Sequence, residues 1–155
     1  MQVAEAYLEV SDRAVDETTD TTSRIKVEDV RKLALPLGTY VAAGDGLLNQ
    51  TVVWTTVIYP EDGVSSKSLQ AGEMILVSAV EGNGSPAVTD VDIIRWSSDM
   101  KASAVVLSEE PSPSAIAEAK AYGIPVLVLP KNSRIRLVEK AIVSLLVDRK
   151  GQIER

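Results

Sequence analysis

Residues 103–130 read SAVVLSEEPSPSAIAEAKAYGIPVLVLP, and this stretch decides the fold. Two apolar runs, residues 103–107 and 125–129, have the length and the branched side chains of buried strands. Between them, Ser112 followed by Pro113 is a typical helix start, and Gly123 is a typical helix end. A strand, a helix and a second strand at this spacing predict two parallel strands joined by a right-handed crossover.

The same alternation extends on both sides of this unit. Upstream, residues 73–79 predict a strand, and residues 91–100 predict a helix capped by Thr89 or Asp90. Downstream, residues 134–148 carry apolar side chains at helical spacing. The sequence therefore predicts an α/β fold with three layers, in which helices flank a mostly parallel sheet.

The segment before residue 73 adds one helix and two strands. Residues 27–35 predict a short helix, which Pro36 ends. Residues 39–43 and 51–58 are β-branched and apolar, and they predict strands joined by a turn around Gly44.

We expect three parts along the chain. Residues 1–23 predict an N-terminal helix, in which Val3 and Tyr7 share one face, and a linker rich in Asp and Thr. Residues 24–148 form the main domain in this prediction, and residues 149–155 form a polar tail.

The composition excludes several classes of chemistry. The 155 residues contain no cysteine and no histidine, so disulfides, thiolate or imidazole metal ligands and Ser-His or Cys-His catalysis are excluded. We therefore expect no catalytic residues, no cofactor and no metal.

The net charge of -6 argues against direct contact with nucleic acid. The apolar runs are shorter than a membrane span of about 20 residues, so we expect a cytoplasmic protein that does not enter a membrane.

Six stretches carry a resemblance to a known family: residues 27–33, 41–44, the Val-x-Trp element Val52-Val53-Trp54, the Gly-Glu-apolar strand 72–76, and residues 101–107 and 117–130. In this order they resemble the purine catabolism regulator-like (PucR-like) N-terminal domain of bacterial transcriptional regulators. That family often has a histidine two residues after the tryptophan and an acid three residues further on, whereas this chain has Thr56 and Tyr59.

The resemblance implies a non-enzymatic sensor or assembly domain, with the DNA-binding unit elsewhere in the regulator. Its ligand would be a small metabolite effector, related to purines only through the name of the family. Two alternatives stay open at this point. The chain could be a dimerisation module without a ligand, or a small enzyme that depends on a carboxylate or a lysine.

Three polar residues follow predicted parallel strands. Ser78, Ser108 and Lys131 come at the carboxyl ends of strands, where open α/β sheets bind their ligands. A loop with the sequence Gly82-Asn83-Gly84-Ser85 lacks the Lys and Ser/Thr that end a phosphate-binding loop, so we interpret it as a plain turn.

Trp54 and Glu73 are the other two candidate ligand-binding residues. A strand tryptophan such as Trp54 can stack on a flat base, but it more often packs in a core, and we favour the core. Glu73 heads a strand and could act as a base if it were buried, yet no partner acid lies at a suitable spacing.

We expect a homodimer, because the helix over residues 134–148 carries more apolar surface than one sheet can cover. A partner would cover the strip that the sheet leaves exposed, although the N-terminal helix of the same chain is an alternative cover. The sheet-facing stripe in this prediction is Ile135, Val138, Ile142 and Leu145, and the second strip is Val143, Leu146 and Val147.

Overall fold

The computed structural model describes residues 24–64, 69–79 and 88–154, and the side chains as far as residue 148. Its strands are β1 (Tyr40–Ala43), β2 (Trp54–Ile58), β3 (Glu73–Val77), β4 (Ala104–Leu107) and β5 (Val126–Val128), and its helices are α2 (Val27–Leu33), α3 (Asp90–Asp99), α4 (Pro113–Tyr122) and α5 (Ile135–Glu154).

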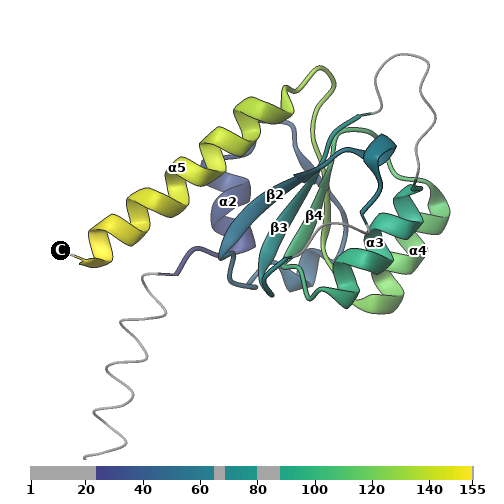
Figure 1. The fold of residues 1–155 in the computed structure, drawn as a ribbon, viewed down its shortest axis with the longest axis horizontal. Helices are drawn as coiled ribbons and strands as arrows, with labels where there is room; N and C mark the ends of the chain where they lie inside the picture. The colour runs from purple at the N-terminus through teal and green to yellow at the C-terminus, as the bar shows by residue number, and fades with distance from the viewer. Residues whose placement is uncertain (1–23, 65–68, 80–87, 155) are drawn as a thin grey trace, which may run out of the picture.

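The described strands form one sheet in the order β1-β5-β4-β3-β2. Strands β2 to β5 run parallel to their neighbours, and β1 pairs antiparallel with β5. Figure 1 shows α2 and α5 on one face of the sheet and α3 and α4 on the other. The predicted three-layer α/β fold with a mostly parallel sheet is therefore confirmed.

The core consists of two layers, one on each face of the sheet. All five residues of β3 and all four of β4 are buried, because helices cover both faces of these central strands. Side chains alternate along a strand, so Met74 and Leu76 pack with α2 and α5, whereas Ile75 and Val77 pack with α3 and α4. This double burial explains why the strands appear in the sequence as continuous apolar runs.

The helix ends follow the predicted signals. Thr89 caps α3, since its hydroxyl accepts a hydrogen bond from the Asp92 N–H at 3.2 Å and the Asp92 carboxylate accepts one from the Thr89 N–H at 3.1 Å. Ser112 caps α4 by accepting from the Ala115 N–H at 3.1 Å. Gly123 ends α4 with a φ of 73°, a conformation that glycine adopts without steric cost.

Strands β1 and β2 are close in sequence but lie at opposite edges of the sheet. The turn around Gly44 therefore does not fold them onto each other. Instead, the connecting segment passes the starts of the parallel strands, where Gly44 lies against Pro125 and the Val53 N–H donates to the Gly72 carbonyl at 3.0 Å. Residue Thr51, predicted as strand, makes an isolated bridge with Lys26.

Helix α5 differs from its prediction in two ways. Its backbone stays helical through Glu154, so the predicted polar tail at residues 149–155 continues the helix as far as that residue. Leu146 lies in the core with Val138 and Ile142, so placing Leu146 on a second, exposed strip was wrong. None of the helices in the described ranges combines the length and the apolar character that a membrane crossing requires.

Two sequence predictions lie outside the described residues. They are the N-terminal helix and linker of residues 1–23 and the turn Gly82-Asn83-Gly84-Ser85.

Candidate functional site

Ser78 and Ser108 lie side by side at the carboxyl edge of the parallel strands. Each directly follows a buried strand, β3 or β4. The Ser108 N–H and hydroxyl both donate to the Val77 carbonyl, at 3.2 and 2.7 Å, and the Ser78 N–H donates to the Ile58 carbonyl at 2.9 Å. These bonds hold both residues at the ends of the strands, where they separate two hollows of the surface.

The first hollow, which we call the acidic hollow, opens toward α3 and α4. Its volume is about 200 Å³, and apolar side chains such as Ile93 and Leu107 form its floor. The charged residues that line it are Asp90, Glu109 and Glu110, all of them acids.

The second hollow, which we call the basic hollow, opens toward the start of α5. Its volume is about 490 Å³, and its charged lining residues are Arg134 and Arg136. The two hollows share Ser78, Ala79 and Ser108, and we call them together the cleft. A cleft of this size suits a small molecule.

Polar contacts connect α3 with α4 beside the acidic hollow. The Asp90 carboxylate accepts hydrogen bonds from the Ser112 N–H at 2.8 Å and from its hydroxyl at 3.1 Å. Further along the helices, the Arg95 guanidinium donates to Glu118 at 2.8 Å, and this hydrogen bond raises the pKa of Arg95. Asp90 is therefore occupied in positioning α4, which leaves Glu109 and Glu110 as the acids that face the hollow without such a structural bond among the described residues.

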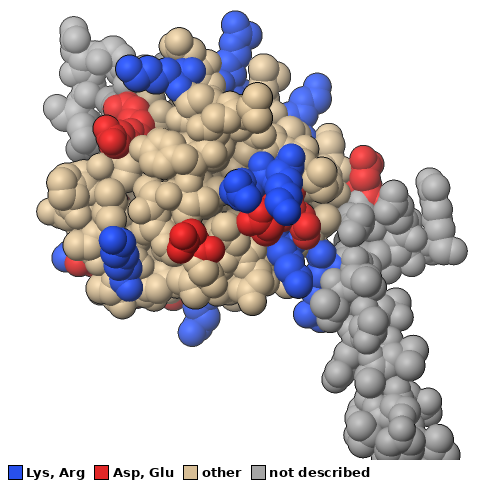
Figure 2. Space-filling view, turned by 180° about the vertical axis from the view of Figure 1, so that it is seen from behind, with Lys and Arg blue, Asp and Glu red and all other residues tan. Residues whose placement is uncertain are grey.

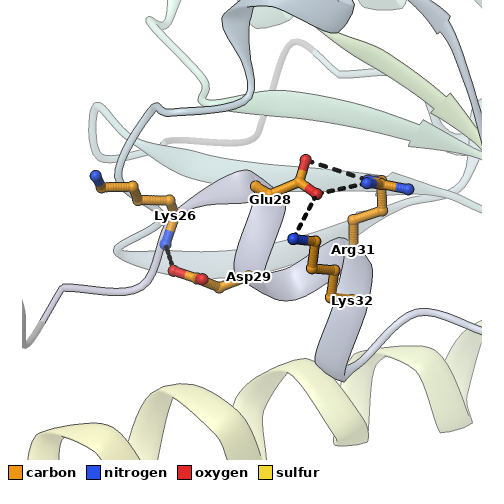
Figure 3. A network of polar contacts seen from close by, with 5 residues as sticks. All are labelled: Lys26, Glu28, Asp29, Arg31 and Lys32. Atoms are coloured by element: carbon orange, nitrogen blue, oxygen red, sulfur yellow. Dashed lines mark hydrogen bonds and ion pairs between the residues drawn. The ribbon is translucent and has the colours of Figure 1, made fainter.

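The charges of the cleft differ from those of α2. On α2, Glu28 accepts a hydrogen bond from Arg31 and pairs with Lys32 at 3.5 Å, as Figure 3 shows. The bond from Arg31 lowers the pKa of Glu28. By contrast, none of the ion pairs found among residues 24–64, 69–79 and 88–148 includes a charged residue of the cleft.

The arginines also lie where a helix does not favour them. The first turns of α2 and α3 contain acids, whereas those of α4 and α5 contain none, and α5 has Arg136 in this turn. Because the helix dipole is positive at this end, Arg136 in the first turn lowers the stability of the helix instead of raising it.

The amino edge of the same sheet contains a buried carboxylate that is hydrogen-bonded within the fold. Glu73 is buried at the start of β3, where its carboxylate accepts hydrogen bonds from the Thr56 hydroxyl and, at 2.9 Å, from the Gln70 N–H. Trp54 pairs in register with Glu73 on the neighbouring strand and is 42% exposed. The preference for Trp54 as a core residue was therefore wrong.

The five predicted ligand-binding residues do not form one site. Ser78 and Ser108 line the cleft together. Trp54 and Glu73 lie at the opposite edge, about 16 Å away along strands of five residues. Lys131 is exposed in the turn after β5 and lines neither hollow.

Sequence reasoning missed Arg134 and Arg136 as cleft residues. Their signal was present, because two arginines at the start of a predicted helix run against the usual preference for acids there. Reading those positions for charge as well as for hydrophobicity would have marked the two arginines as unusual, but it would not have placed them in the cleft.

The cleft offers binding groups, namely hydroxyls, carboxylates and guanidinium groups around an apolar floor. Within the described parts of the chain, the acids do not come together in a group of three or more that could hold a metal ion.

No protein-family model matches the chain, and no curated protein matches it either.

Proposed function

We propose that this chain is a non-enzymatic sensor domain that binds a small effector in the cleft at the carboxyl edge of its sheet. The main support for this proposal is that Ser78 and Ser108 form a wall shared by two hollows with charged linings. Open parallel sheets bind ligands at this edge, because loops and helix ends with free polar groups gather there.

The non-enzymatic part of the proposal rests on residue chemistry. The chain has neither histidine nor cysteine, which removes the most common general base and the most reactive nucleophile. Glu73, the buried carboxylate, is held by Thr56 and Gln70 at the edge away from the cleft. These bonds give Glu73 a structural role, so its position does not favour the alternative of a carboxylate-dependent enzyme.

The wider role follows from the resemblance to PucR-like domains. On this proposal the domain belongs to a bacterial transcriptional regulator in the cytoplasm, and DNA is bound by another part of that regulator. The net charge of -6 fits a segment that does not touch DNA itself. Purines are the first effectors to test, because the family is named for their catabolism.

A thermal-shift screen against purines, nucleotides and common metabolites tests the proposal. A ligand that binds only the folded state raises stability by about 2.7 kcal/mol at a hundredfold excess over its Kd. The matched variants are Ala79→Trp, which fills the wall shared by the hollows, and Ala121→Trp, which adds the same side chain to an exposed position of α4. The effector should stabilise the wild type and Ala121→Trp but not Ala79→Trp. Equal stabilisation of all three proteins would place the ligand elsewhere and contradict the proposal.

A dimerisation module is the second candidate function, and the surface around β1 favours it. Leu37 is 99% exposed, and Leu33 and Tyr40 are 67% and 47% exposed. The stretch from residue 33 to residue 44 contains no charged residue, and β1 forms an edge of the sheet. Figure 2 shows that most of the described surface on that side of the molecule is neither acidic nor basic. A second copy of the chain could pair with this edge.

Light scattering at high protein concentration tests the second candidate. A homodimer through β1 predicts twice the monomer mass for the wild type and the monomer mass for Leu37→Glu. Leu137→Glu, at an exposed apolar position of α5, is the matched control and should remain dimeric. A wild type that stays monomeric, or a dimer that only Leu137→Glu disrupts, would exclude dimerisation through β1.

A further inference from the structure

The two hollows of the cleft carry opposite charge. The charged residues that line the acidic hollow are all acids, and those that line the basic hollow are both arginines. Charged residues of the two signs thus line the two hollows on either side of the shared serines. Within the described residues, Glu109 and Glu110 form no ion pair with Arg134 or Arg136, so no direct ion pair joins the two hollows.

We propose that the ligand of this cleft is bipolar, with an anionic group in the basic hollow and an amine or another strong hydrogen-bond donor in the acidic hollow. This inference rests on the proposed function and adds the chemical class and the orientation of the effector. Guanidinium groups recognise carboxylates and phosphates through paired hydrogen bonds. Ionised carboxylates can only accept hydrogen bonds, so the acidic hollow selects a donor.

The residues between the two hollows indicate the chemical nature of the central part of the ligand. The Ser108 hydroxyl donates to the Val77 carbonyl at 2.7 Å, so its oxygen remains able to accept a hydrogen bond from a ligand. The floor beside it is apolar, with Ile93 and Leu107. A short apolar linker between the two polar ends therefore fits the cleft better than a third charged group.

Four small probes separate the two ends of the ligand. Phosphoethanolamine carries a phosphate and an amine, 4-aminobutyrate carries a carboxylate and an amine, and inorganic phosphate and ethanolamine each carry one end alone. Binding is measured by titration in ¹H–¹⁵N NMR spectra of the whole chain, through the amide signals of Ser78 and Ser108. At least one bipolar probe should bind about tenfold more tightly than either single-ended probe. The comparison of phosphoethanolamine with 4-aminobutyrate shows whether the anion is a phosphate or a carboxylate.

Charge-neutralising variants test the orientation. Arg134→Gln/Arg136→Gln should weaken phosphate binding about tenfold and leave ethanolamine binding unchanged, and Glu109→Gln/Glu110→Gln should do the reverse. The controls are Lys120→Gln/Lys140→Gln and Asp99→Asn/Asp148→Asn, which alter the net charge equally at exposed positions. If a control pair weakens binding as much as its matched cleft pair, general electrostatic attraction explains the result and the bipolar site is refuted.

The remaining outcomes separate this inference from the proposed function. An uncharged effector that stabilises the wild type but not Ala79→Trp would overturn the bipolar ligand and leave the sensor role intact. If none of the four probes shifts the signals of Ser78 and Ser108, the bipolar ligand is likewise refuted. If the metabolite screen also finds no ligand for the cleft, the sensor role fails as well.

Discussion

The two edges of the parallel sheet use polar residues in opposite ways. At the amino edge, Glu73 is bonded to Thr56 and Gln70, so the polar groups satisfy one another inside the fold. At the carboxyl edge, Glu109 and Arg136 line hollows and form no ion pair among the described residues. The polar groups at the amino edge therefore contribute to the stability of the domain, whereas on our proposal the charged side chains at the carboxyl edge serve to bind a ligand.

The largest expected change in unfolding free energy comes from the tight packing of Gly44 at the amino edge. Gly44 has a φ of 76°, and a Cβ added there would lie 2.8 Å from the Cα of Pro125. Gly44→Ala should therefore lower the free energy of unfolding by about 3 kcal/mol, through backbone strain and the clash. Gly46→Ala is the matched control, because a Cβ at Gly46 meets nothing within 4 Å. Urea unfolding of both variants measures the difference, and equal losses would show that this edge is not tightly packed.

Replacing one glutamate at each edge compares how much the two edges contribute to the unfolding free energy. Glu73→Ala leaves the Gln70 N–H and the Thr56 hydroxyl without their acceptor, which should cost about 1–3 kcal/mol of unfolding free energy. Glu109→Ala, at the exposed carboxyl edge, should change it by less than about 0.5 kcal/mol. Chemical denaturation provides both values. A larger loss for Glu109→Ala than for Glu73→Ala would reverse the roles assigned to the edges.

Most of the fold was predictable because its signals are local. The cap at Thr89, the Ser112-Pro113 start and the Gly123 end are set by hydrogen bonds and φ angles within a few residues. The positions of β1 and β2 at opposite edges were not predictable in this way. They depend on which strand pairs with β5 or β3, and no local pattern determines that pairing.

The candidate site was predictable only in part. Ser78 and Ser108 could be placed because they follow buried strands, and the carboxyl ends of parallel strands lie at the same edge. Arg136 was missed because its place in the cleft depends on where α5 crosses the sheet. The exposure of Trp54 was missed because apolar strand residues at a sheet edge and in the centre look alike in sequence.

At the start of α5 we expect a smaller effect, a gain in unfolding free energy instead of a loss. Replacing a cation near the positive end of the helix dipole by an anion should stabilise the helix, so Arg136→Glu should raise the unfolding free energy by about 0.3–1 kcal/mol. Lys140→Glu, one turn further along α5, is the control and should change it less. Thermal unfolding at low salt measures both variants. A loss of stability in Arg136→Glu would mean that Arg136 serves the fold and is not kept for binding.

The smallest effect concerns the cap of α3 and its pH dependence. Hydrogen bonds from Thr89 lower the pKa of Asp92 below its ordinary value of 3.8. A carboxylate with a lowered pKa in the folded state stabilises the fold above its unfolded pKa, and this contribution is lost as the pH falls through the folded pKa. Between neutral pH and about pH 3, the wild type should therefore lose slightly more stability than Asp92→Asn. Denaturation curves at the two pH values test this, and identical losses would show that the cap does not depend on the charge of Asp92.

The most direct test of the central claim is an NMR titration with the effector that gives the largest thermal shift in the metabolite screen. A ligand bound in the cleft should shift the amide signals of Ser78, Ser108 and Arg134 together and leave those of Trp54 and Glu73 in place. Shifts centred on Trp54 and Glu73, with Ser78 and Ser108 unaffected, would place the ligand at the amino edge and contradict binding in the cleft.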